Sequence, residues 1–333
     1  MEGIFVCPFY PSTLPLTRMN EIKVGLIGGT GLGGLLAGHE SIRTHEIQTP
    51  FGSPSDSIIE TQWSGLPVLL LSRHGPGHLL NPSSVPYRAN IFALKKLGCT
   101  HLIATGAVGS LREEFHPTHL VVPDQIIDRT ANRPSTFFEK AAVHVEFAEP
   151  FCGLLRQILL EAGKAQAGLA VHDRGCYLAM EGPAFSTRAE SLMHRLWGGD
   201  LIGMTAMPEA KLAREAEMAY ALVALVTDYD CWRNKPQKEG QGKDGPAKEG
   251  ETVKPDPAGL LQEIIGNLQT ASENALRLIR RAVEMIAANP AAVATSPAHE
   301  ALKLAIWSEK SRIAPEEVQR LAPLWLKYFD SVS

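Results

Sequence analysis

Seven continuous apolar runs constrain the fold of this 333-residue chain more than any other feature. They cover residues 22–29, 66–75, 99–110, 119–128, 176–186, 199–206 and 218–230. Runs of this length and composition are typical of strands that are buried on both faces of a sheet. None approaches the roughly 20 apolar residues that a membrane-spanning helix needs.

Segments with helical spacing of apolar residues separate several of these runs. The expected helices cover residues 85–98, 151–166, 207–216, 258–288, with a break near Gly266, and 314–329. Pro208 and Glu209 suit the first turn of the third one, where proline and acidic residues are favoured. The alternation predicts an α/β fold, a single domain with a mixed, mostly parallel central β-sheet flanked by helices.

Charge and cysteine usage exclude several classes of protein. The net charge of −4 argues against nucleic acid as a main partner, because phosphate backbones need clustered Lys and Arg. The five cysteines are scattered and form no CxxC pair, which argues against a disulfide framework or a zinc site. We expect a cytoplasmic protein with no metal site.

The sequence suggests three parts. Residues 1–20 form an N-terminal extension that lacks the basic start of a signal peptide, so we weigh a true start at Met19 against a disordered arm. Residues 21–290 form the main domain, and residues 291–333 a C-terminal extension of unknown role. Within the domain, residues 233–257 are rich in Lys, Glu, Gly and Pro and contain no large apolar residue except Val253, which predicts an inserted mobile loop.

The glycine-rich stretch "GLIGGTGLGGLLAG" after the first strand contains a GxGxxG pattern at Gly29, Gly31 and Gly34. A dinucleotide site would need a second strand that ends in an acidic residue about 20 residues later. The following "HESIRTHEIQTPFGSPSD" contains none, so a nicotinamide enzyme is disfavoured. The stretch is either a tight turn without a ligand or an anion-binding loop, to which Thr30 would add a hydroxyl.

Other candidate anion-binding residues follow other strands of the expected sheet. Arg73 and His74 end the second run, the small residues around Ala107 end the third, and Thr205 ends the sixth. Because the carboxyl ends of parallel strands share one edge of a sheet, these groups could converge with Thr30 on one phosphate-sized anion.

The seventh run ends in two carboxylates, in "VALVTDYDCW". Carboxylates are seldom buried without a partner. On the residues alone, Asp228 and Asp230 either cap the following turn, pair with a cation, or keep a proton for use in catalysis.

Together these motifs resemble the trimeric purine nucleoside phosphorylases, the family that includes the methylthioadenosine phosphorylases. The resemblance covers residues 22–232 and the helix at 258–288. It rests on "GLIGGTGL", "TPFGSPSD", "RHGPGH", "CTHLIATGAVGSLREEF", "DQIIDRT", "RPSTFF", "HVEFAEPFC", "EGPAFSTRAES" and "GMTAMPEAKLAREAEMAYALVALVTDYDCW". It implies phosphorolysis of the N-glycosidic bond of a purine nucleoside, here methylthioadenosine, with inorganic phosphate as co-substrate and no cofactor. It also implies a homotrimer with sites near the subunit boundaries.

The resemblance assigns roles to matching positions. The expected phosphate-binding residues are Thr30, Arg73, His74, Gly106, Ala107 and Thr205. The expected nucleoside-binding residues are Met204 under the ribose, Phe185 and Ser186 beside the base, His144 near the 5′ substituent, and Leu261 and Ile264 over the methylthio group.

The resemblance also gives the two aspartates a catalytic role. A protonated Asp228 would donate to N7 of the leaving purine and accept from the 6-amino group of adenine, with Asp230 orienting it. Asparagine at 228 would instead favour 6-oxopurines, and the oxopurine branch carries glutamate where this chain has Ser186. Both differences favour adenine.

Three positions depart from the family pattern: Gly106 stands for a hydroxyl residue, Gly203 for asparagine and Ala184 for arginine. A phosphorylase for 6-oxopurine nucleosides or methylthioinosine is the nearest alternative. A nucleoside-binding protein without turnover is a more distant one.

Overall fold

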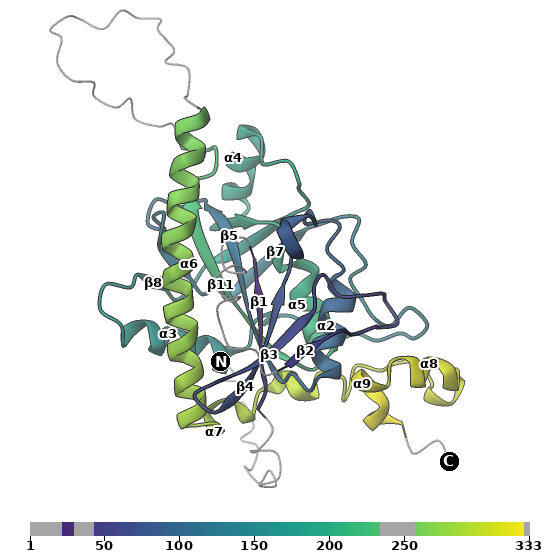
Figure 1. The fold of residues 1–333 in the computed structure, drawn as a ribbon. Coiled ribbons are helices and arrows are strands. Elements are labelled where there is room, and N and C mark those ends of the chain that lie inside the picture. Colours follow the sequence, from purple (N-terminus) through teal and green to yellow (C-terminus); the bar gives the residue numbers. More distant parts are fainter. Residues whose placement is uncertain (1–21, 30–42, 234–256, 330–333) are drawn as a thin grey trace, which may run out of the picture.

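The computed structural model describes residues 22–29, 43–233 and 257–329 (Figure 1). Within them one sheet has eleven strands. The strands are β1 (Val24–Gly28), β2 (Arg43–His45), β3 (Ile58–Trp63), β4 (Leu66–Ser72), β5 (His101–Ser110), β6 (Leu120–Val121), β7 (Gln125–Arg129), β8 (Val171–His172), β9 (Cys176–Met180), β10 (Leu201–Gly203) and β11 (Ala219–Asp228).

The sheet is mixed and mostly parallel, as the sequence predicts. Its main path is β2-β3-β4-β1-β5-β10-β9-β7, and β11 pairs with β5 and β6. Strand β1 lies parallel to β4 and β5, and β11 lies parallel to β5. Strand β10 runs antiparallel to β5 and parallel to β9. The carboxyl ends of β1, β4 and β11 therefore point the same way.

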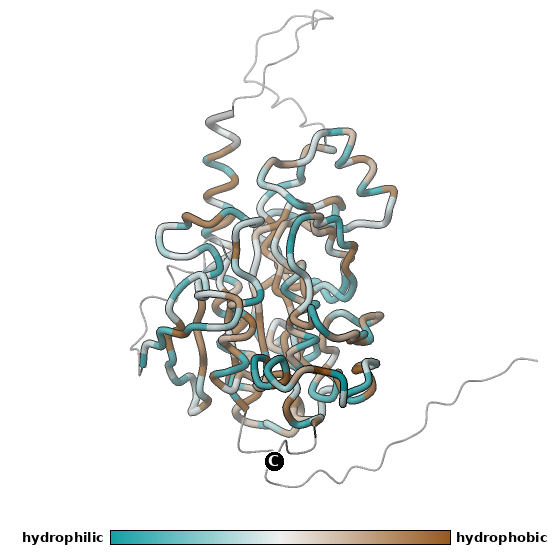
Figure 2. Tube along the Cα trace, turned by 90° about the vertical axis from the view of Figure 1, so that its right-hand side faces the viewer, coloured by the Kyte–Doolittle hydropathy of each residue, from teal (hydrophilic) through white to brown (hydrophobic). Residues whose placement is uncertain are grey.

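Helices cover both faces of the sheet. They are α2 (Tyr87–Lys96), α3 (Gly153–Lys164), α4 (Arg188–Leu196), α5 (Ala206–Glu215), α6 (Pro257–Ala288), α7 (Ala291–Ala294), α8 (Pro315–Arg320) and α9 (Ala322–Trp325). One buried core lies between the sheet and helices α3 and α6. A second core joins the other face to α2 and α5. Figure 2 shows the hydrophobic segments running through the middle of the molecule.

The C-terminal segment closes the second core. Trp325 is fully buried there, together with Leu302 and Leu321. Val143 forms a β-bridge with Ile306, so this segment also pairs with the loop that precedes α3. The boundaries expected at residues 20 and 290 stay predictions.

The structure corrects several expected elements. The run 119–128 is divided into β6 and β7 around Pro123, which cannot donate to the sheet ladder. Helix α6 continues through Gly266 without a break, because its packed face outweighs the small cost of one glycine. The segment 314–329 is not one helix but α8, α9 and a 3₁₀ turn, and Pro323 lies at the start of α9.

Five helices and strands, the short helix α7 among them, are absent from the sequence-based expectation. Strands β2 and β8 are short, and β3 alternates buried and accessible positions instead of forming a continuous apolar run. Helix α4 was not expected either. The N-terminal extension and most of the expected loop at 233–257 lie outside the described residues. No helix in the described ranges is long and apolar enough to cross a membrane.

Candidate active site

The parallel strands bring the first candidate residues together at one edge of the sheet. Gly28 at the end of β1 pairs with Ser72 at the end of β4, and Ile27 pairs with Ala104 on β5. The next residues along these three strands are Gly29, Arg73 and Thr105. The backbone N–H of Gly29 donates to Thr105 Oγ1 at 3.3 Å.

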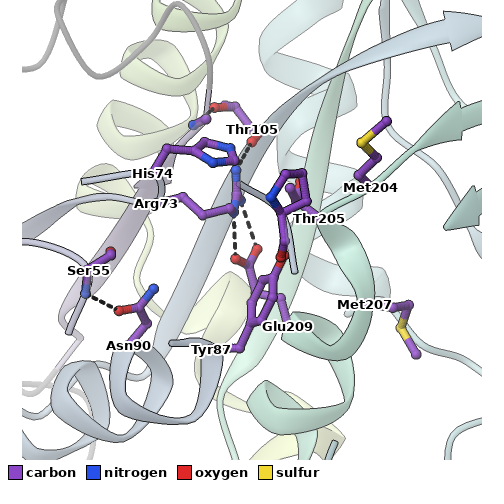
Figure 3. A network of polar contacts seen from close by, with 12 residues as sticks. Ser55, Arg73, His74, Tyr87, Asn90, Thr105, Met204, Thr205, Met207 and Glu209 are labelled. Atoms are coloured by element: carbon purple, nitrogen blue, oxygen red, sulfur yellow. Dashed lines mark hydrogen bonds and ion pairs between the residues drawn. The ribbon is translucent and has the colours of Figure 1, made fainter. Parts of the chain in front are cut away.

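Arg73 is completely buried and held on two sides (Figure 3). Its Nε and Nη2 donate to the two carboxylate oxygens of Glu209 at 2.8 and 2.9 Å, and its Nη1 donates to the Thr105 carbonyl at 2.7 Å. Tyr220 Oη donates to Glu209 at 2.9 Å. Burial opposes the charge, but the facing Glu209 carboxylate outweighs it and raises the pKa of Arg73, so the guanidinium stays charged.

This arrangement leaves donors of Arg73 for an anion. Among the described residues, Glu209 and Thr105 use three of its five N–H groups, which leaves one on Nη1 and one on Nη2. A β-carbon on Gly29 would lie 2.8 Å from Arg73 Nη1 and 2.8 Å from the Thr105 carbonyl oxygen. The backbone of the glycine loop can therefore approach the guanidinium only because residue 29 has no side chain.

Thr205 joins this group from another strand. The antiparallel register of β5 and β10, which pairs Ile202 with Gly109, places Thr205 opposite Gly106 when it is continued past the end of β10. A β-carbon on Gly106 would lie 3.3 Å from Thr205 Oγ1. A larger residue at 106 would crowd this hydroxyl, so the glycine leaves it accessible.

His74 lies beside Arg73 but adds no positive charge at neutral pH. Burial, together with the charge of Arg73, lowers the pKa of His74 to about 4, although the hydrogen bond to Leu80 opposes this shift. Its Nδ1 lies 2.7 Å from the Leu80 carbonyl, to which the neutral ring donates, and the ring stacks on His78.

Asp228 is positioned at the end of β11 by its neighbours. Thr227 Oγ1 donates to its Oδ2 at 2.7 Å, and the backbone N–H of Asp230 donates to its Oδ1 at 2.7 Å. Burial raises the pKa of Asp228, the charges of Asp230 and Glu263 raise it further, and the two hydrogen bonds counter part of this shift. Asp230 has a left-handed φ of 51° and a buried Oδ2 without a hydrogen-bond partner among the described residues.

The expected base-side residues lie on two loops that contact each other. Met204 packs over Gly182, where a β-carbon would lie 2.5 Å from the Met204 sulfur. Gly182 belongs to the "EGPAFS" loop, which carries Phe185 and Ser186. Cys231 Sγ, next to Asp230, donates to the Ser186 carbonyl at 3.3 Å. The sugar, base and aspartate candidates thus form one continuous region.

Helix α6 reaches the same region. Asn267 donates to the Thr227 carbonyl at 2.9 Å, and Glu263 is close enough to influence Asp228. Ile264 lies one turn before Asn267, and Leu261, whose side chain is 58% exposed, lies one turn earlier still. The exposed Leu261 and the partly buried Ile264 are both apolar, which suits the expected role of covering the methylthio group.

Three expected residues need separate mention. Thr30 lies outside the described residues. Ala107 lies in β5 next to Gly106, paired with Leu225 of β11. His144 contacts the C-terminal segment instead of the residues above: its backbone N–H donates to the Ala305 carbonyl at 2.9 Å, and its ring packs against Trp307.

A profile described as "Phosphorylase superfamily" matches residues 23–284. The chain belongs to the phosphorylase superfamily. Its sequence is 46% identical over 316 residues to the S-methyl-5′-thioadenosine phosphorylase of Synechocystis sp., covering 94% of this chain and 90% of the relative. It is also 46% identical to the enzyme of the same name from Chloroflexus aurantiacus, covering 93% of this chain and 100% of that relative.

Solved structures of this superfamily share the fold. A crystal structure of methylthioadenosine phosphorylase from an Antarctic soil metagenomic library superposes with a TM-score of 0.77 at 43% identity, covering 92% of this chain and 99% of that one. Methylthioadenosine phosphorylase from Schistosoma mansoni in complex with tubercidin gives 0.70 at 35% identity, covering 80% and 93%. These findings confirm the family that the motifs resemble.

Several side chains in this phosphorylase fold were not anticipated from the sequence. Glu209, Tyr220 and Arg133 are all buried. Glu209 accepts from Arg73 and Tyr220, and Arg133 donates to the Met204 carbonyl, so these side chains hold the site residues in place. Glu209 was expected only as a residue of a helix N-terminus. Its signal was the rarity of a glutamate among the apolar residues of a buried helix, which indicates a charged partner.

Proposed function

We propose that this chain catalyses the reversible phosphorolysis of S-methyl-5′-thioadenosine to adenine and 5-methylthioribose 1-phosphate. The observation that carries the proposal is the combination of Asp228, whose pKa is raised by burial, with the buried Arg73 and Thr205 hydroxyl at the same edge of the sheet. The curated relatives with this activity match almost the full chain.

In the proposed reaction, phosphate binds beside Arg73, Thr205, Thr30 and the backbone at His74, Gly106 and Ala107. One phosphate oxygen forms a bond to C1′ of the sugar while the C1′–N9 bond breaks and its electron pair moves into the purine. Asp228 gives its proton to N7, which stabilises the leaving base, and the transition state resembles an oxocarbenium ion. Asp230 holds Asp228 through its backbone N–H.

The remaining expected residues would bind the nucleoside. Met204 packs under the ribose, Phe185 and Ser186 border the base, and Leu261 and Ile264 cover the methylthio group. We propose a homotrimer in which a neighbouring subunit contributes His144, because within one chain this histidine packs against Trp307. We also propose a cytoplasmic enzyme without a metal or cofactor, since phosphate supplies the nucleophile and Asp228 the proton.

A panel of nucleosides tests the assigned substrate. Purified protein is incubated with phosphate and methylthioadenosine, adenosine, methylthioinosine or inosine, and release of free base is followed. We expect methylthioadenosine to give the highest kcat/KM. A 6-oxopurine nucleoside as the best substrate would favour the 6-oxopurine phosphorylases, and binding of nucleoside without turnover would favour a non-catalytic protein.

Gly29→Ala is expected to weaken phosphate binding. The new β-carbon would lie 2.8 Å from both Arg73 Nη1 and a backbone oxygen, so the loop must move. Overpacking of this kind costs about 1–3 kcal/mol, and 1.4 kcal/mol is about tenfold, so KM for phosphate should rise about tenfold or more. Initial rates against phosphate concentration measure this. Gly153→Ala, where a β-carbon meets nothing within 4 Å, is the matched control. An unchanged KM would contradict the close approach.

The pH dependence of turnover should depend on Asp228. Because burial raises the pKa of Asp228, the protonated form persists to higher pH than for an ordinary aspartic acid. Loss of that proton removes the acid, so kcat should fall as pH rises through the raised pKa. The Asp228→Asn variant, measured over the same pH range, should lack this descending limb. The same limb in both proteins would assign it to another group.

A further inference from the structure

The segment between β10 and α5 carries both Met204 and Thr205, and Arg133 fixes its carbonyl groups. Arg133 Nη1 donates to the Met204 carbonyl at 2.5 Å and to the Met207 carbonyl at 2.7 Å. The same guanidinium donates to the Glu181 carbonyl at 2.5 Å and pairs with the Glu181 carboxylate. The carbonyl side of this turn is therefore bound to a buried cation.

The N–H side of the turn meets a different group. The backbone N–H of Thr205 donates to Tyr177 Oη at 3.3 Å. Tyr177 is 1% exposed and comes from β9, the strand next to β10. Burial raises the pKa of its hydroxyl, and hydrogen bonds from Thr205 and Ala206 counter part of that shift. The phenol therefore stays neutral and serves as an acceptor for the start of α5.

The tip of Tyr177 fills the space above Gly203. A β-carbon on Gly203 would lie 2.1 Å from Tyr177 Oη and 2.6 Å from Cζ. No real β-carbon approaches another atom so closely, so a tyrosine at 177 in this position requires glycine at 203. The two residues form a matched pair, which gives a physical reason for the glycine at position 203.

We propose that Tyr177 is a positioning residue for phosphate binding, acting through Thr205. Its hydroxyl occupies the space that a side chain at 203 would need, and it fixes the backbone of Thr205 so that Oγ1 faces Gly106 and the phosphate region. Arg133 holds the carbonyls of the same turn from the other side. This inference rests on the proposed function, in which phosphate is the co-substrate.

Tyr177→Phe removes only the hydroxyl and keeps the ring, so the variant should fold. KM for phosphate is expected to rise about fivefold, the loss typical of one neutral hydrogen bond, while KM for methylthioadenosine stays within about twofold. A purely structural role would lower the thermal midpoint without separating the two KM values. Tyr328→Phe is the matched control. It removes a hydroxyl of the C-terminal segment that donates to Glu217, and it should change neither KM.

A double-mutant comparison tests the pairing of Tyr177 with Gly203. Gly203→Ala should raise KM for phosphate more than about tenfold when Tyr177 is present, because the methyl group displaces the phenol. In a Tyr177→Leu background, where the ring is absent, the same change should add at most about twofold. Equal effects of Gly203→Ala in the two backgrounds would overturn the pairing.

Calorimetric titration with inorganic phosphate separates this inference from the proposed function. If the wild-type protein turns over methylthioadenosine and Tyr177→Phe has unchanged KM and Kd for phosphate, the role of Tyr177 is wrong. If the wild type binds phosphate without turnover and Tyr177→Phe binds it about fivefold more weakly, the proposed function fails and the role of Tyr177 stands. If the wild type neither binds phosphate nor turns over nucleoside, both are overturned.

Discussion

Asp228→Asn is expected to lower kcat for methylthioadenosine by about 10²–10⁴-fold, the usual contribution of a positioned general acid. The asparagine amide has no proton to transfer to N7, and its oxygen can face N7 while its NH₂ group faces position 6 of the base. The substitution also presents N–H where the carboxyl oxygen would accept from the 6-amino group of adenine. Relative activity should therefore shift toward methylthioinosine and inosine.

The geometry around Asp228 makes this prediction specific. The backbone N–H of Asp230 and the Thr227 hydroxyl fix its two oxygens, so the carboxyl group cannot rotate to reach other partners. Steady-state rates with the four nucleosides, for wild type and variant, measure both effects. Asp173→Asn, the same change at an exposed position, is the matched control and should leave all rates unchanged. Full activity of Asp228→Asn on methylthioadenosine would remove Asp228 from the mechanism.

Glu209→Gln is expected to lower the free energy of unfolding by about 3–5 kcal/mol. Removing one partner of a buried ion pair leaves the other charge uncompensated, and this penalty is far larger than the net gain from the pair itself. Both side chains here are almost completely buried, at 0% for Arg73 and 1% for Glu209. The hydroxyl of Tyr220 would also lose a charged acceptor. Urea unfolding followed by circular dichroism measures the loss.

The variant should also show that Glu209 orients Arg73. Without the two-point contact, the guanidinium loses the geometry that directs its free N–H groups toward Gly29, so KM for phosphate should rise more than KM for the nucleoside. Glu284→Gln breaks the exposed pair with Arg281 and serves as control, with an expected loss of about 0–1 kcal/mol. Wild-type stability of Glu209→Gln would contradict the predicted penalty for leaving the buried charge of Arg73 without its partner.

The sequence predicted the parts of the site that depend on local patterns. Continuous apolar runs identified the central strands, and strand ends predicted that Arg73 and Thr205 would lie close together. Thr205 follows a strand that runs antiparallel to β5, so the parallel arrangement expected for its strand was wrong. Helix α4 could also have been found, because Thr187 and Glu190 form the capping box that marks a helix start. Strand β2 could not, since it has only three residues, two of them exposed.

The supporting contacts could not be predicted because they join residues far apart in the chain. Arg73 and Glu209 are separated by 136 positions, and nothing in either local sequence identifies the other. The same is true of Tyr177 and Gly203. The glycine at 203 looked like a departure from the family pattern, and only the position of the Tyr177 ring shows what replaces the missing side chain.

The central claim is phosphate-dependent cleavage of methylthioadenosine. The most direct measurement is release of adenine from methylthioadenosine with and without inorganic phosphate, together with ³¹P NMR of the products. The account predicts adenine release only with phosphate, and one equivalent of a sugar 1-phosphate for each adenine. Adenine release at the same rate without phosphate would identify a hydrolase and contradict the account.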